Sequence, residues 1–458
     1  MNKLQQTIRN LLEHGVERTD RTGVGTLAQF GHIDRWDLEV GHPHENAKYT
    51  PFKINVAELL WIISGSTRLK FLKEHNCHVW DEWVKPGTEV WGREYSYKER
   101  LEIFKRKCEE GKIQKEAVDQ YVDIWMEMHP NAVMDAEANE LMMENFKIHT
   151  HELLDGELGP VYGQQWRSII DTRRVTLSEV EGYVKRGYRL VGVLEEPGNP
   201  LRTTGQGRRG RGRRMARTAT RIKSSGKVAI VERKIDQLQN VIDQLINKPD
   251  DRGIIVNAWH VPDLDQMALR PCHTLFQFDT ERRPWDEVLS DITESEHWDE
   301  WDERIQGKSS LKKEADDWIE ARNGRGFRSP DFYEFIYEFA ENKQIPTRKL
   351  SCLLYQRSQD SYLGRPFNIT QYALLTRMVA QVVNMHPGEF ILVNGNLHLY
   401  KSHIEPAKKF LEQDGTRPLP WVNINPDVKR IEDFKVEDFE IVNYAGNHGP
   451  KIGAPVAV

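Results

Sequence analysis

The stretch MALRPCHTLFQF, residues 267–278, places a cysteine beside a histidine, directly after a proline and at the start of an apolar run. Its continuation, CHTLFQFD, is rich in strand-forming residues and predicts a β-strand that begins at Cys272. A buried free cysteine is common at such a position. A nucleophilic cysteine must instead react as a thiolate, so its usual pKa of about 8.5 must be lowered. This stretch alone leaves both interpretations open.

The segments on either side of this strand predict an α+β fold. Before it, IDQLQNVIDQLINK predicts an amphipathic helix and IIVNAWHV a buried strand. After it, KLSCLLYQRSQD alternates like a strand, FNITQYALLTRMVAQVVN predicts a long buried helix and EFILVNG a further strand. INVAELLWIISG and TRLKFLKEHN predict two helices nearer the N-terminus. We expect these strands to form a sheet whose helices pack on one side.

Composition is that of a soluble globular protein. The chain has 458 residues, of which 38% are hydrophobic and 29% charged, enough for a large core and more than one structural unit. A net charge of −6 excludes a polycation that binds nucleic acid over its whole surface. Four cysteines without a CxxC spacing indicate a reducing cytoplasm and no metal site. The N-terminus lacks the apolar core of a signal peptide, and no run approaches the roughly 20 apolar residues of a membrane span.

Four stretches are typical of a compact core, and three charged stretches between them are typical of insertions. We expect one discontinuous core domain from residues 1–84, 151–169, 235–280 and 347–458. The insertions are residues 85–150, 170–234 and 281–346, of which the first and third predict helical hairpins. WDEW at 298–301 repeats the tetrapeptide at 80–83 and is expected on an exposed helix.

The second insertion contains GQGRRGRGRRMARTATR, residues 205–221, with seven arginines. A segment so rich in glycine and arginine cannot bury a core and predicts a mobile loop. It is either a solvated insertion or an electrostatic contact to RNA, DNA or an acidic partner. No aromatic residue interleaves the arginines, so base stacking is not indicated.

Eight segments occur along the chain in an order that is specific as a set. They are DRTGVGT (20–26), AELLW (57–61), HVWDEW (78–83), GELGPVYGQQWR (156–167), PCHTLFQF (271–278), LYQRSQDSYLGRPFNITQYALL (354–375), NGNLHLYKSH (394–403) and the terminal APVAV. Together they resemble the thymidylate synthase family, folate-dependent enzymes that methylate dUMP, over roughly 260 of the 458 residues. The resemblance implies a thymidylate synthase-like α+β fold, with a mixed β-sheet whose open face forms a homodimer interface.

The resemblance implies that Cys272 is the nucleophile that adds to C6 of the pyrimidine. Arg357 would lower the pKa of the cysteine and bind the nucleotide phosphate together with Ser358 and Arg21. Arg252 matches a phosphate arginine that reaches across from the second subunit. The adjacent family arginine is replaced by Gly253, so phosphate affinity is weaker or another arginine substitutes.

Other matched residues would bind the nucleotide base and sugar and move protons. Asn368 matches the amide that reads the uracil edge, where the related dCMP hydroxymethylases are expected to carry aspartate, so it favours dUMP. His398 and Tyr400 match the groups that hold the deoxyribose hydroxyl. Glu58, a carboxylate in an otherwise apolar helix, matches the glutamate that organises water and proton transfer. Tyr162 matches the tyrosine that serves proton removal from C5.

The implied co-substrate is 5,10-methylenetetrahydrofolate, without a metal. The folate rings would lie against Trp80, Asp360, Gly364 and Phe367, and the tail containing Ala457 would close over them. His273 is not assigned as a base, because neighbouring residues on a strand point to opposite faces.

Several positions depart from the family pattern near the folate and the C5 side of the nucleotide. Pro51 stands where the family has a histidine that contacts folate. Gln359 stands where the family commonly has a small residue or a cysteine, and residues 394–396, Asn-Gly-Asn, stand where it usually has Gly-Gly-Asp. Three functions follow as alternatives. The first is reductive methylation of dUMP to dTMP, and the second is hydroxymethylation of dUMP with water as the last reactant. The third is a weakly catalytic relative that binds nucleic acid through residues 205–221.

Overall fold

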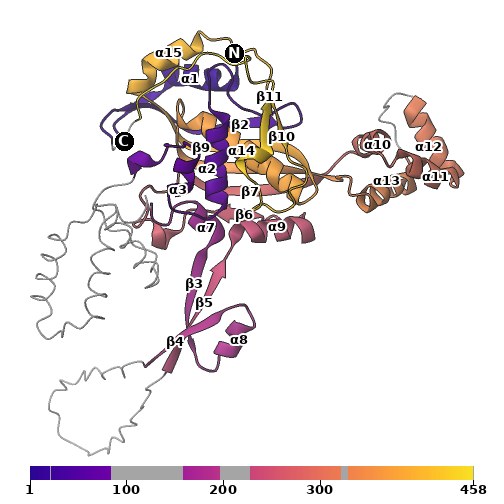
Figure 1. Ribbon diagram of the computed structural model, residues 1–458, viewed down its shortest axis with the longest axis horizontal. Coiled ribbons are helices and arrows are strands. Elements are labelled where there is room, and N and C mark those ends of the chain that lie inside the picture. The colour runs from indigo at the N-terminus through magenta and orange to yellow at the C-terminus, as the bar shows by residue number, and fades with distance from the viewer. Residues whose placement is uncertain (21, 84–157, 196–226, 321–327, 457–458) are drawn as a thin grey trace, which may run out of the picture. The chain divides into compact units, whose positions relative to one another are not determined.

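The computed structural model describes residues 1–20, 22–83, 158–195, 227–320 and 328–456 (Figure 1). The chain divides into two compact units. One comprises Met1–Arg167 with Gln237–Val458, and the other comprises Ser168–Asp236. No helix among the described residues is both long enough and apolar enough to cross a membrane.

A six-stranded sheet organises the larger unit. Its order is β1 (Val16–Arg18), β2 (Thr26–Asp37), β9 (His386–Tyr400), β8 (Arg348–Asp360), β7 (His273–Arg282) and β6 (Ile255–Asn257). β8 and β9 run parallel and every other neighbouring pair runs antiparallel, so the predicted mixed sheet is confirmed. The helix α14 (Gly364–Val382) connects the two parallel strands, as a crossover between parallel strands requires.

The predicted buried strand IIVNAWHV is shorter than expected and buried at alternate residues only, namely Ile254, Val256 and Ala258. β6 covers only three residues at the edge of the sheet, where it pairs with β7 alone. Ile255 and Asn257 are exposed and only Val256 between them is buried. Backbone pairing with β7 ends at Ala258, whose N–H donates to the Thr274 carbonyl at 2.9 Å, and the Asn257 side chain accepts the backbone N–H of Trp259 at 2.9 Å.

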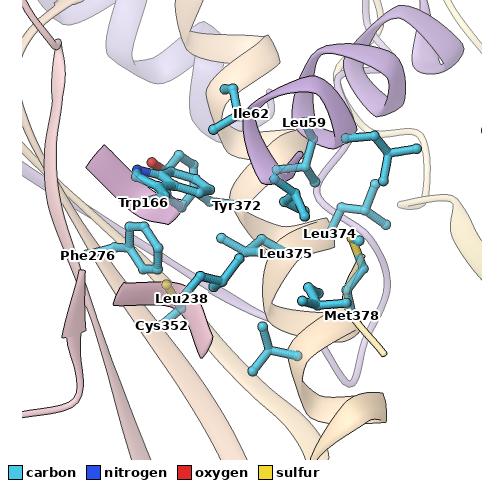
Figure 2. Packing of buried hydrophobic residues seen from close by; sticks show 14 of the residues in the cluster. Leu59, Ile62, Trp166, Leu238, Phe276, Cys352, Tyr372, Leu374, Leu375 and Met378 are labelled. Carbon is cyan, nitrogen blue, oxygen red and sulfur yellow. The ribbon is translucent and has the colours of Figure 1, made fainter. Parts of the chain in front are cut away.

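The main core lies between the sheet and helices α2 (Phe52–Ile63), α14 and α9 (Gln237–Asn247). Figure 2 shows side chains of α2 and α14 meeting residues of β7 and β8. The short helix α7 (Gly163–Arg167) packs directly on α2 because it begins with glycine. A Cβ atom at Gly163 would lie 2.6 Å from the carbonyl oxygen of Ile62. This close approach positions Tyr162, the residue before α7.

The remaining elements of the larger unit are short and surround the sheet. They are α1 (Lys3–His14), α3 (Lys70–Glu74), η1 (Asp81–Trp83), η3 (Val261–Asp263), η4 (Lys401–His403), α15 (Ile404–Leu411), β10 (Trp421–Ile424), η5 (Val436–Asp438) and β11 (Phe439–Val442). A second apolar cluster joins α1, α15 and the end of β9.

The charged stretch 281–346 is helical, as predicted, but it is not a hairpin. It contains α10 (Trp285–Glu294), α11 (Trp298–Gln306), α12 (Ser309–Glu320) and α13 (Pro330–Asn342), which share their own apolar cluster. The expectation that WDEW lies on an exposed helix is wrong, because Trp301 is only 1% exposed. Its ring stacks on Trp298 at 5.3 Å and faces Phe335.

The smaller unit is a three-stranded antiparallel sheet that the sequence analysis did not predict. Its strands are β3 (Ile169–Thr176), β5 (Lys227–Ile235) and β4 (Arg189–Glu195), in that order, with the short helix α8 (Val180–Val184). Four buried residues form its core: Val175, Tyr188, Ala229 and Val231. The arginine-rich stretch 205–221 and the predicted insertion 85–150 lie outside the described residues.

Candidate active site

One cavity of about 500 Å³ in the larger unit gathers most of the predicted site residues. It opens where β7 begins and where β8 and β9 end, beside α2 and the start of α14. The residues predicted from sequence that line it are Glu58, Trp80, Tyr162, Cys272, Arg357, Ser358, Asp360, Gly364, Phe367, Asn368, His398 and Tyr400. Residues far apart in the sequence thus meet at one end of the central strands.

Cys272 is held by backbone contacts with a tyrosine and an arginine. Its backbone N–H donates to Tyr162 Oη at 2.9 Å, and its carbonyl accepts the N–H of Arg357 at 3.0 Å. The Arg357 guanidinium donates to the carbonyls of Pro271 and Arg270, both at 2.8 Å. A permanent positive charge is therefore fixed beside the cysteine, where it favours a thiolate and attracts a phosphate.

Tyr162 lies at the turn before α7 with a φ of 31°, in the left-handed region that non-glycine residues rarely adopt. Burial, followed by the charge of the neighbouring Cys272, raises the pKa of Tyr162 far above its ordinary value. The phenol therefore stays protonated. Its oxygen accepts from Cys272, so its own proton is free to point elsewhere.

Glu58 points from α2 toward the cavity and is bound by two donors. Trp80 Nε1 donates to one carboxylate oxygen at 2.8 Å, and Gln371 Nε2 donates to the other at 2.6 Å. Burial raises the pKa of Glu58 above its ordinary value, against these two hydrogen bonds, which lower it. The carboxyl group can therefore hold a proton at a higher pH than an exposed glutamate can.

His273 also lines the cavity, so the expectation that it faces away from Cys272 is wrong. β7 begins at His273, and Cys272 precedes the strand, so the alternation of faces does not extend to it. Burial lowers the pKa of His273 to about 4, against a hydrogen bond with Asn368 that raises it. The imidazole is therefore neutral at neutral pH, so no imidazolium is present there to act as a general acid.

His398 and Tyr400 lie at the end of β9, where β9 pairs with the start of β2. Burial lowers the pKa of His398 below its ordinary value, and its Nδ1 lies 2.9 Å from Asn396 Oδ1. The loop that precedes β2 is shaped by Asp20, whose Oδ1 accepts the N–H of Gly25 at 2.9 Å. Arg21 lies outside the described residues, so its predicted role is not addressed by the geometry.

Apolar side chains also line the cavity, and we call them the apolar wall. It consists of Ile62, Val79, Trp80, Trp83, Leu269, Leu363, Phe367, Ala454 and Val456. Asp360 adds an ionised carboxylate, because contacts with His403 and the Tyr362 N–H outweigh the burial that would raise its pKa. Flat aromatic rings beside one acceptor fit a flat heterocycle with N–H donors, as a folate has.

The carboxyl-terminal segment lines this cavity with Ala454 and Val456, and two polar contacts outside the cavity hold the segment in place. Tyr362 Oη donates to the Ile452 carbonyl at 3.1 Å, and His403 Nε2 lies 2.7 Å from the Pro455 carbonyl oxygen. Ala457, predicted to contact folate, lies just outside the described residues.

One predicted residue does not reach the cavity, and several lining residues were missed. Arg252 is exposed in the turn before β6 and does not line the cavity. Gln356 lines it but was not singled out, although it stands inside the quoted LYQRSQD motif. Among the described residues, no cluster of three or more histidine, cysteine or acidic side chains could hold a metal ion.

A comparison with family models agrees with the geometry of the cavity. The thymidylate synthase model matches residues 2–294 and 332–458. The unmatched residues 295–331 lie within the stretch 281–346, which was predicted to be an insertion, and contain α11 and α12. The match covers the strands, helices and loops that line the cavity. The chain therefore belongs to the thymidylate synthase family.

Proposed function

We propose that this protein converts dUMP to dTMP with 5,10-methylenetetrahydrofolate, releasing dihydrofolate. The observation that supports this most is a single cavity shared by a cysteine with a fixed guanidinium, a buried carboxyl group, an amide and an apolar aromatic wall. Nucleophile, proton-transfer group, base reader and folate surface are the parts that this reaction needs.

Cys272 would begin the reaction by adding its thiolate to C6 of the uracil ring. The electron pair of the C5–C6 double bond then moves toward C5 and O4, which turns C5 into a nucleophile. Arg357 favours the thiolate because its guanidinium is tied to the two carbonyls that precede Cys272. The same cation, with Ser358 beside it, would bind the phosphate.

Glu58 and Tyr162 would manage the protons. A carboxyl group with a raised pKa can give a proton toward O4 as charge develops there and recover it afterwards. Tyr162 would help remove the C5 proton through water, since its own phenol remains protonated. Loss of the C5 proton would break the bond between the transferred carbon and the folate nitrogen and leave a methylene group on C5. Addition of hydride from tetrahydrofolate to that carbon would then expel the thiolate from C6, restore the C5–C6 double bond and free Cys272.

Folate supplies one carbon and, in the methylation reaction, a hydride. Trp80 and Phe367 would hold its rings, and Asp360 would accept from a ring N–H. Ala454 and Val456 would cover it and keep water from the reacting carbon.

We also propose that the enzyme is a homodimer through the open face of the sheet. Ile33, Val393, Tyr355 and Leu275 are direct partners across β2, β9, β8 and β7, so they share one face. Ile33 is 62% exposed and the other three are only half-buried, although β8 and β9 are central strands. A sheet with an apolar open face needs a second layer, and a second copy supplies an identical one.

The test is an assay with purified protein, dUMP and methylenetetrahydrofolate. Absorbance would follow dihydrofolate, and mass spectrometry would weigh the nucleotide product. Dihydrofolate with a methylated nucleotide supports the proposal. A hydroxymethylated nucleotide without dihydrofolate would replace it with a dUMP hydroxymethylase.

Substitution of the nucleophile tests the mechanism in the same assay. Cys272→Ala should reduce turnover by roughly 10⁴-fold or more while dUMP still binds. Cys352→Ala is the matched control, because Cys352 is buried in the core away from the cavity and its loss should lower only stability. Turnover retained by Cys272→Ala would contradict covalent catalysis.

A further inference from the structure

The side chain of Asn368 is connected to a buried arginine through a series of amide groups. We call Arg365, Gln359, Asn394 and Gln356 the amide relay. All four are at least 97% buried, and they come from β8, β9 and the start of α14. Two of them, Gln359 and Asn394, stand at positions where the sequence departs from its family, so these departures occur together in one network.

Arg365 sets the polarity of the relay, because a guanidinium can only donate hydrogen bonds. It forms an ion pair with Asp34 of β2. One of its terminal nitrogens donates to Gln359 Oε1 at 2.6 Å and to Asn394 Oδ1 at 2.7 Å. Burial lowers the pKa of Arg365 to about 10, although Asp34 opposes this, so the group stays charged at neutral pH. Both amide oxygens must therefore face the arginine.

The orientation of Gln359 then fixes the next two amides. With its oxygen on Arg365, its NH₂ group donates to Gln356 Oε1 and, at 3.2 Å, to Asn368 Oδ1. Gln356 in turn donates from Nε2 to the same Asn368 oxygen at 2.9 Å. Asn368 Oδ1 thus receives two amide donors beside the contact of Asn368 with His273, so its lone pairs are occupied. The orientation of an amide is often ambiguous, but here a permanent cation at the end of the series decides it.

We propose that Arg365 and Gln359 are positioning residues that hold the Asn368 amide with its NH₂ group toward the cavity, so that the site selects pyrimidine nucleotides with an acceptor at C4. The 4-oxo group of dUMP would accept from this NH₂ group. The 4-amino group of dCMP would place a donor against a donor and leave both unsatisfied. This inference rests on the proposed function, since it assumes that Asn368 faces the base.

Gln359→Glu tests the relay with almost no change of shape. A carboxylate can still accept from Arg365 and Asn394, but it can no longer donate to Gln356 and Asn368. The amides of Gln356 and Asn368 should then turn so that their NH₂ groups donate to the new carboxylate, and Asn368 would present its oxygen to the cavity. Isothermal titration calorimetry with dUMP and with dCMP measures the consequence. The ratio of the dCMP to the dUMP dissociation constant should fall by roughly tenfold or more.

Two further variants separate positioning from a general structural role. Gln359→Leu removes acceptor and donor together and should also lower the ratio, though by less, because Gln356 still holds Asn368. Gln381→Glu makes the same chemical change on α14, where Gln381 donates to the carbonyls of Asn425 and Val428 outside the cavity. That control should leave the ratio unchanged. Thermal unfolding of each variant establishes that it is folded.

The outcomes distinguish this inference from the proposed function. If the wild-type protein binds neither dUMP nor dCMP, both the relay and the proposed function are overturned. Wild-type protein that prefers dCMP would overturn the donor orientation of Asn368 and the choice of dUMP. Wild-type protein that prefers dUMP, with the same ratio in both Gln359 variants, would overturn the relay alone. A ratio that falls in both variants and not in Gln381→Glu supports it.

Discussion

Glu58 shows how a single residue can be placed for chemistry at the expense of stability. Its carboxyl group lies in an apolar helix with two donors, and burial raises its pKa. A raised pKa in the folded state means that the folded protein binds this proton more tightly than the unfolded chain does. The resulting stability is fully present below the unfolded pKa of about 4.5 and is lost as pH rises through the folded pKa.

Glu58→Gln should therefore be more stable than the wild type at pH 8, by on the order of 1 kcal/mol, and no more stable near pH 4. Its turnover should fall by roughly 10²–10⁴-fold, because the proton-transfer group is gone. Thermal unfolding of both proteins from pH 4 to pH 8 checks the stability. A stability difference that shrinks as pH rises would mean that the ionised carboxylate stabilises the fold.

Much of the candidate site could be predicted from short motifs. Cys272, Arg357 and Asn368 stand within quoted segments, and the structure brings all three to one cavity. The amide relay could not be predicted in the same way. Three of its members, Gln359, Arg365 and Asn394, and the ion-pair partner Asp34 belong to four elements. The direction of each amide depends on which side chains tertiary packing places around it.

At the scale of an element, the carboxyl-terminal segment has its own role. Ala454 and Val456 line the apolar wall, while Ile452 and Pro455 are anchored by Tyr362 and His403. His403 also contacts Asp360, one of the proposed folate residues. Loss of the segment should therefore affect folate more than dUMP.

Deletion of residues 452–458 should raise the KM for methylenetetrahydrofolate by about tenfold or more and change the Kd for dUMP by less than about twofold. Steady-state kinetics and calorimetry give the two values. Tyr362→Phe is the milder matched variant, because it removes only the hydrogen bond to Ile452 and keeps the ring. An equal loss of affinity for nucleotide and folate would refute a specific role for the segment.

Elements with strong periodicity were predictable, and elements with small cores were not. β8 alternates, and α14 contains the closely spaced apolar groups YALL and MVA, so both could be recognised from the sequence. β3 and β4 of the smaller unit are mostly exposed and share a core of only four residues with β5. Such a core leaves little apolar patterning in the sequence, which explains why this sheet was not predicted.

At the scale of the whole molecule, Arg252 needs an explanation, because it was predicted to bind phosphate but does not line the cavity of its own subunit. Arg252 stands in the exposed turn before β6, at one edge of the sheet whose open face we propose as the dimer interface. In a symmetric dimer a residue at this edge can reach the site of the partner. Each active site would then be built from both subunits.

Mixed dimers of Cys272→Ala and Arg252→Ala test this arrangement. Each variant alone should be impaired, but a mixed dimer contains one site with an intact cysteine and an intact arginine from its partner. Random mixing should restore about a quarter of the wild-type activity, because half of the dimers are mixed and each has one intact site. Activity is measured after coexpression of the two chains, and sedimentation gives the oligomeric state. Failure to restore activity would place Arg252 outside the partner's site.

The three described cysteines differ in a way that bears on chemical labelling. Cys77 and Cys352 are buried, and burial raises the pKa of each thiol to about 12, whereas Cys272 is only partly buried in an open cavity. Alkylating reagents attack thiolates, so Cys272 should react first among these three. Cys108 lies outside the described residues and is told apart by its own peptide. An alkylating reagent can therefore serve as an active-site titrant. The fraction of chains labelled at Cys272 would give the fraction of competent sites in a preparation.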